Sequence, residues 1–160
     1  MDEERIKEVG ADRAAAEWLI RCGAAVKWTG SENYDRDYDS LVRITRRYSI
    51  LAIDASDSSV SGVGFPHLKG LKHVREFIVE RNPYLDDEAL KQLVHLQDSL
   101  LSLRIVSCVN VTDAGIQSLS CLHRLRHLYL ADLISVKRAE DCLRVLRSKL
   151  PDCRIESKVK

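Results

Sequence analysis

A short pattern of apolar residues recurs along this chain at nearly constant intervals. Written as L-x-x-L-x-L-x-x-N/C, it fits residues 100–108, and it fits again 26 residues earlier at 74–82 and 25 residues later at 125–133. Weaker matches begin at Tyr48 and Leu150, so five matches follow one another at intervals of 26, 26, 25 and 25 residues. A period of about 20–29 residues is typical of leucine-rich repeats, in which each unit buries its apolar row only by stacking on its neighbours.

The repeat predicts an α/β fold in which the strands are parallel. We expect a leucine-rich-repeat solenoid of four and a half repeats, with the strands on a concave face and the helices on a convex face. The strands are predicted near residues 51–53, 77–79, 103–105, 128–130 and 153–155. The last repeat has a strand but no helix, so it counts as half a repeat.

Residues 1–47 do not follow the repeat. The segment ADRAAAEWLIRCG has an apolar stripe at helical spacing and ends in a glycine, and AAVKW alternates like a strand. The end of a solenoid exposes its apolar core unless another element covers it. We therefore interpret residues 1–47 as a small N-terminal α/β cap domain and residues 48–160 as the leucine-rich-repeat domain.

The cysteines fit structural positions of the repeat. Cys108 occupies the Asn/Cys position that follows the strand, which Asn82 and Ser56 hold in earlier repeats, and Cys153 occupies a strand core position. The five cysteines are odd in number and include no C-x-x-C pair, which argues against a disulfide framework or a zinc site. Such a set of free thiols is typical of a reducing compartment.

Composition and motifs exclude several classes of function. The formal net charge of +1 argues against a nucleic-acid-binding protein, and no apolar run has the length of a transmembrane segment. The sequence contains no G-x-x-x-x-G-K-[ST], G-x-G-x-x-G, H-E-x-x-H or G-x-S-x-G motif. We therefore predict a non-catalytic protein that acts by binding another protein.

The concave strand face is the predicted partner-binding surface. The repeat places Ala52, Ile78, Arg104, Tyr129 and Arg154 in one row on that face, with Glu80 in the next row. Arginine and tyrosine are enriched at protein interfaces, so we select as partner-binding residues Ile78, Glu80, Arg104, Tyr129 and Arg154. The alternative is a solvated face whose acids and arginines pair across strands.

The last part of the chain is basic. Residues 124–160 contain ten Lys or Arg and five Asp or Glu. This excess favours peripheral association with an anionic membrane surface, and an ordinary solvated helix surface explains it equally well.

Four segments resemble one family over nearly the whole chain. They are DRAAAEWLIRCGAAVKW, AIDASDSSVSGVGFPHLKGLKHV, IVSCVNVTDAGI and LRHLYLADL, and they are similar to the family of mitochondrial ATP synthase coupling factor B, also called subunit s. That family is related to an assembly component of the distal membrane arm of complex I. The resemblance implies an N-terminal domain followed by leucine-rich repeats, and a location on the matrix side of the inner mitochondrial membrane. The family's targeting segment is not among these 160 residues, so this location rests on the resemblance alone.

The resemblance also implies a function, partners and a metal. The function would be to support proton-coupled ATP synthesis by limiting proton leak at the membrane sector, with ATP synthase membrane-sector subunits as partners. The alternatives are assembly of the complex I membrane arm and, from the repeat type, a substrate receptor of a ubiquitin ligase. The metal would be Mg²⁺ bound by the backbone carbonyls of Gly23 and Ser56, although a helix cap and a solvated turn also explain these residues.

Overall fold

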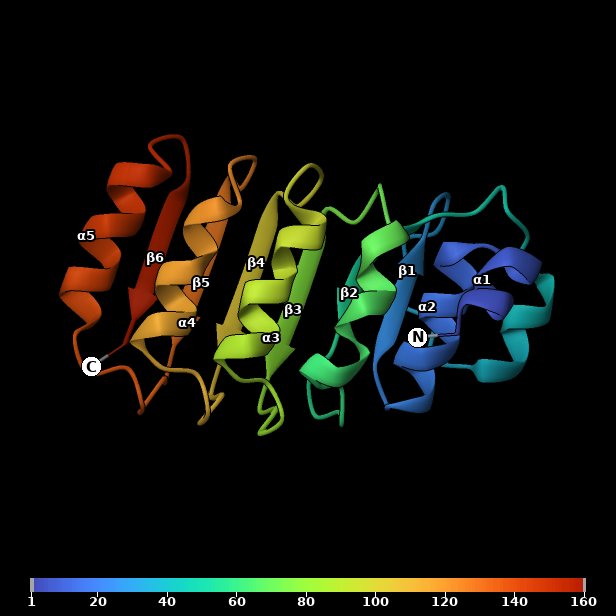
Figure 1. The fold of residues 1–160 in the computed structure, drawn as a ribbon, viewed down its shortest axis with the longest axis horizontal. Coiled ribbons are helices and arrows are strands. Elements are labelled where there is room, and N and C mark those ends of the chain that lie inside the picture. Colours follow the sequence, from blue (N-terminus) through green and yellow to red (C-terminus); the bar gives the residue numbers. More distant parts are fainter. Residues whose placement is uncertain (1, 160) are drawn as a thin grey trace.

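The computed structural model describes residues 2–159, which form an open six-stranded sheet with strand order β1-β2-β3-β4-β5-β6 (Figure 1). The strands are β1 (Ala25–Trp28), β2 (Ile50–Asp54), β3 (Glu76–Glu80), β4 (Ser102–Val106), β5 (His127–Ala131) and β6 (Arg154–Lys158). β1 is antiparallel to β2, and all later neighbours are parallel. The predicted α/β class is therefore confirmed.

The helices cover one face of this sheet. They are α1 (Glu3–Val9), α2 (Ala11–Arg21), α3 (Asp87–Gln92), α4 (Asp113–Ser118), α5 (Ala139–Lys149) and the 3₁₀ helices η1 (Tyr38–Arg43), η2 (Gly62–Gly70), η3 (Leu93–Leu96) and η4 (Leu119–Cys121). Figure 1 shows α3, α4 and α5 side by side in front of the strands, with α1 and α2 at the N-terminal end. We call the strand face opposite these helices the open face.

Alternation along the strands separates the core from the open face. Phe77, Leu103 and Leu128 are neighbours across β3, β4 and β5, and each is at most 1% exposed. Burial of one such side chain contributes about 1.5–3 kcal/mol relative to an exposed position. The intervening residues of these strands point to the open face, because successive side chains of a strand alternate between its two faces.

The registers at the two ends of the sheet differ from those predicted. The repeat placed Leu51 level with Phe77 and Cys153 level with Leu128, whereas Ile53 and Ile155 occupy these positions. At the C-terminal end, the Arg154 amide donates to the Arg126 carbonyl at 2.9 Å, which fixes Arg154 beside His127. Cys153 therefore precedes β6 and is only partly buried, so its predicted strand core position is wrong.

A shift of two residues keeps every side chain on its own face, because the side-chain period of a strand is two. The apolar pattern alone therefore cannot distinguish the predicted register from the observed one. The three interior strands have the predicted positions, with residues 77–79, 103–105 and 128–130 inside β3, β4 and β5.

Asn82 forms the turn that follows β3. Its side chain is 0% exposed and donates to the carbonyls of Ala55 and Val60 at 3.3 and 3.0 Å. Its amide oxygen accepts from the backbone amides of Tyr84 and Leu85 at 2.8 and 3.2 Å. The side chain thus satisfies four backbone groups from two successive turns, and those of Ala55, Val60 and Leu85 belong to buried residues.

Cys108 holds the equivalent position after β4. It is 0% exposed, and its sulfur lies 3.4 Å from the Val106 carbonyl oxygen. Burial raises the pKa of the Cys108 thiol and so keeps the sulfur protonated. The structural interpretation of this cysteine agrees with its environment.

The N-terminal helices are joined by a buried carboxylate. Glu17 of α2 is 6% exposed and lies 2.6 Å from an Arg5 nitrogen of α1 and 3.4 Å from an Arg13 nitrogen. The Arg5 hydrogen bond holds the pKa of Glu17 below its ordinary value. One cluster of buried residues continues from Ala15 to Leu150, and the division into domains at residue 47 stays a prediction.

Candidate partner-binding site

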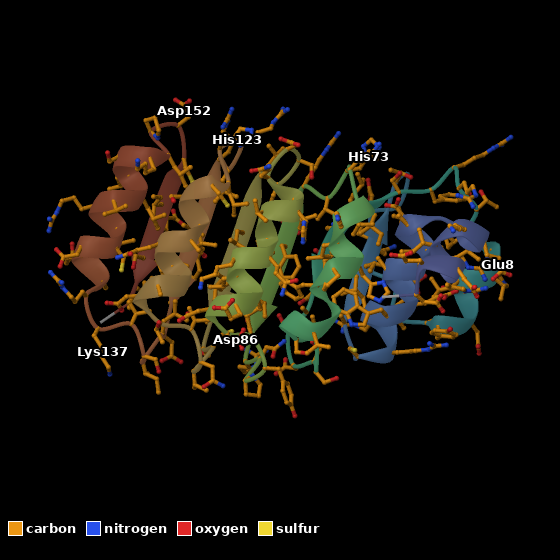
Figure 2. All side chains as sticks on the ribbon, in the orientation of Figure 1. Glu8, His73, Asp86, His123, Lys137 and Asp152 are labelled. Carbon is orange, nitrogen blue, oxygen red and sulfur yellow. The ribbon has the colours of Figure 1, made fainter. Side chains whose placement is uncertain are left out.

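The open face is hollowed where β2, β3 and β4 end. The hollow has a volume of about 530 Å³ and is lined by Gly23, Arg36, Asp54, Ser56, Asp57, Ile78, Glu80, Arg81 and Arg104. In Figure 2, Asp86 and Lys137 mark the edge of the molecule at which the parallel strands end, and His73, His123 and Asp152 mark the opposite edge. The hollow, which we call the open-face cavity, contains three of the five predicted partner-binding residues.

The residues of the open-face cavity come from five separate segments. Gly23 follows α2, Ser56 and Asp57 follow β2, Ile78 lies in β3, and Arg104 lies in β4. Arg36 comes from the segment between β1 and η1, which folds back on β1 because Asp35 and Val26 exchange two backbone hydrogen bonds of 2.7 and 3.0 Å. The segment also covers part of the open face, where the Tyr34 hydroxyl donates to Glu76 at 2.8 Å.

Ion pairs fix the orientation of the charged groups. Arg81 donates two hydrogen bonds to Asp57, at 2.8 and 2.7 Å, and these lower the pKa of the Asp57 carboxyl. Arg104 donates to Glu80 at 2.5 Å, and its guanidinium lies 4.1 Å from the centre of the Tyr129 ring. The lining therefore holds both charges in fixed positions, as suits recognition of a polar partner rather than of an apolar ligand.

Arg36 is the least restrained of the three arginines. Its nearest carboxylate oxygen is that of Asp54 at 3.7 Å, and its side chain is 60% exposed. The repeat pattern does not identify Arg36, because only the folding of its segment onto β1 brings this residue to the open face. A row of strand residues can be read from the repeat, whereas this placement depends on a single backbone bridge.

The structure brings most of the predicted partner-binding residues together. Ile78, Arg104 and Tyr129 are direct neighbours across β3, β4 and β5, and Glu80 is joined to Arg104. Arg154 does not share their row as predicted, since Glu156 is the residue beside Tyr129 and Arg154 lies beside His127. The two-residue shift of β6 causes this difference, although Arg154 keeps its predicted face.

Ala52 is the second residue of the predicted row that lies elsewhere. Its neighbour on β3 is Glu76, and Asp54 is the residue beside Ile78. Ala52 is only 4% exposed. The binding role of the remaining residues stays a prediction.

Both residues of the implied magnesium site line the open-face cavity. Asp54 accepts a hydrogen bond from the Ser56 amide at 3.0 Å, and Asp57 is held by Arg81. Among residues 2–159 there is no cluster of three or more His, Cys, Asp or Glu side chains able to hold a metal. Mg²⁺ often keeps several waters and needs few protein ligands, so two carbonyls and a water-bonding carboxylate fit a loosely held, hydrated ion.

No helix within residues 2–159 combines the length and the apolar character that crossing a bilayer requires.

All five cysteines are free thiols.

Comparison with known proteins identifies clear relatives. The chain is 40% identical to the human protein named ATP synthase subunit s, mitochondrial, over 164 aligned positions that cover all of this chain and 82% of the relative. The proteins of the same name from Rattus norvegicus and Bos taurus are 43% and 40% identical with the same coverage. No protein-family model matches the chain.

Proposed function

This chain belongs to the family of ATP synthase subunit s, mitochondrial, and on that basis we propose that it is a non-catalytic mitochondrial protein that associates with ATP synthase. These relatives align with the whole of the chain, and their name describes a subunit of a complex. The association is therefore an interaction between proteins, and the open-face cavity is the surface that we assign to it.

The row of Ile78, Arg104 and Tyr129 supports this assignment. A half-buried isoleucine, an arginine and a tyrosine lie next to one another on rigid strands, and arginine and tyrosine are among the residues that dominate binding energy at protein interfaces. Since Glu80 and Tyr129 already fix the orientation of Arg104, little side-chain entropy is lost when a partner contacts it.

The more specific role that we propose comes from the resemblance to the subunit s family. We propose that the protein limits proton leak at the membrane sector, on the matrix side of the inner membrane, by occupying a surface of that sector. We also propose that β2 to β6 and their helices form a leucine-rich-repeat solenoid of four and a half repeats. The regular parallel register of β3, β4 and β5 supports this interpretation.

A magnesium ion at Gly23 and Ser56 is a further part of the proposal. It would link the end of α2 to the turn after β2 and so stabilise the cavity wall, with no role in chemistry. We expect Mg²⁺ to raise the melting temperature relative to EDTA in the unaltered chain and to have less effect in Asp54→Asn, whose side chain binds ion-bound water less strongly. Equal melting temperatures with and without Mg²⁺ would remove the metal from the proposal.

Affinity capture from detergent-solubilised mitochondria tests the function. We expect the tagged chain to enrich ATP synthase membrane-sector subunits, and Arg104→Glu to lose them because the substitution places two acids beside each other at Glu80. Arg144→Glu on α5 is the matched control, since Arg144 is an exposed arginine away from the open face.

Two other outcomes of the affinity capture would change the proposed function. Enrichment of complex I membrane-arm subunits would replace ATP synthase with complex I assembly as the function. Enrichment of ubiquitin-ligase scaffold proteins would favour the receptor alternative.

A further inference from the structure

The two edge strands of the sheet, β1 and β6, differ in how far their outer edges are covered. The outer edge of β1 is partly covered, because Val26 and Asp35 exchange both of their backbone hydrogen bonds. Within residues 2–159 no strand pairs with the outer edge of β6, which is the last strand in the sheet order. An uncovered edge presents a row of N–H and C=O groups that can pair with another strand.

The register of β6 identifies the groups at this edge. The Arg154 amide donates inward to the Arg126 carbonyl at 2.9 Å, and Arg154 lies beside His127 in the parallel ladder. Because the N–H and C=O groups of successive residues point to opposite edges of a strand, those of Ile155 and Ser157 point outward. These are the groups available to a new strand.

The charged side chains of β6 favour a second copy of this chain as the pairing partner. Arg154 and Glu156 project on the open face with 73% and 40% of their side-chain surface exposed, and they contact each other at 2.6 Å. An antiparallel second copy centred on Ile155 would place Arg154 opposite Glu156 of the second copy. It would also bring Asp152, which lies in the turn before β6, close to Lys158 of the second copy, so the charges that meet between the two copies are opposite.

Other symmetric registers lack this complementarity. A pair centred on Glu156 would place Glu156 opposite itself and Arg154 opposite Lys158, so each cross-strand pair would join like charges. A pair centred on Ser157 would join Glu156 with Lys158 but would leave Arg154 without an acidic residue opposite it. Only the first register pairs every charge of β6 with its opposite.

We propose that two copies of this chain associate by antiparallel pairing of their β6 strands, with Ile155 opposite Ile155 of the second copy. The pairing continues the sheet across the dimer with the helices of both copies on one side. It exchanges the ion pair within each β6 for two ion pairs between copies. This self-association is separate from the proposed contact with ATP synthase, which uses the open-face cavity.

Charge reversal tests both the surface and the register. Sedimentation velocity of the full 160-residue chain over a wide concentration range is expected to show a monomer–dimer equilibrium. Arg154→Glu and Glu156→Arg each place two pairs of like charges in the interface, and each is expected to weaken dimerisation by about tenfold or more. A mixture of the two variants restores opposite charges in every pair, so it is expected to form a heterodimer.

Arg144→Glu on α5 serves as the matched control and is expected to dimerise like the unaltered chain. Circular dichroism spectra and melting temperatures verify that each variant is folded, and exposed charge reversals of this kind leave the core intact. A chain that stays monomeric at every concentration would overturn the proposal. A dimer that neither single reversal weakens, or a mixture that fails to associate, would overturn it as well.

Discussion

Asn82→Ala is expected to lower the free energy of unfolding by about 4 kcal/mol, because each buried group left without a hydrogen bond costs about 1–3 kcal/mol. The substitution removes both donors to Ala55 and Val60 and the acceptor shared by Tyr84 and Leu85. In a chain of this length the loss corresponds to a fall of about 8–16 °C in melting temperature. Urea unfolding followed by circular dichroism measures it directly.

Asn110→Ala is the matched control for this prediction. Asn110 also donates its side-chain amide to the carbonyl of an earlier turn, that of Pro83 at 2.5 Å, but it is exposed. Water replaces the lost hydrogen bond there, so we expect a loss below about 1 kcal/mol. Equal losses for the two variants would mean that the turn position after β3 does not organise the stack of strands.

Gly64→Ala is expected to destabilise the protein by about 3 kcal/mol, at the upper end of the usual cost of overpacking. A Cβ atom at Gly64 would lie 2.1 Å from the Nε1 atom of Trp18. The indole cannot move aside easily, since it stacks on His67 with ring centres 5.2 Å apart and meets the edge of Phe65. Equilibrium unfolding in urea gives the change in stability.

Two further variants show whether the Trp18 contact is the cause. Gly62→Ala meets its nearest atoms, those of Ala89, at 3.3 Å, so we expect a much smaller loss. In the background of Trp18→Leu, Gly64→Ala is expected to cost less than it does alone, because the obstructing ring is gone. Additive effects of the two substitutions would contradict the proposed packing of α2 against η2.

The interior of the sheet could be predicted from the sequence because three consecutive matches constrain one another. β3, β4 and β5 contain the predicted core residues, among them Phe77, Leu103 and Leu128, in direct register. At the ends, each match has a neighbour on one side only. At these ends, backbone hydrogen bonds such as that from Arg154 to Arg126 determine the register. The side-chain pattern of the sequence does not predict such hydrogen bonds.

The residues of the candidate site also differ in predictability between the interior strands and the segments outside the repeat. Ile78 and Arg104 were placed correctly because they lie on interior strands, and their neighbour Tyr129 follows from the same period. Gly23 and Ser56, the two residues of the magnesium site that the resemblance implies, both line the open-face cavity, and their role as metal ligands stays a prediction. Arg36 could not be identified, since its segment has no repeat partner and reaches the open face only through the bridge between Asp35 and Val26.

The affinity of the purified chain for purified ATP synthase tests most directly whether the open-face cavity binds ATP synthase. We expect saturable binding that Arg104→Glu weakens by about tenfold or more, as for a contact at the centre of an interface. Arg144→Glu, with its charge reversed on the helix-covered side, is expected to bind like the unaltered chain. Binding that both variants weaken equally, or that Arg104→Glu leaves unchanged, would contradict the claim.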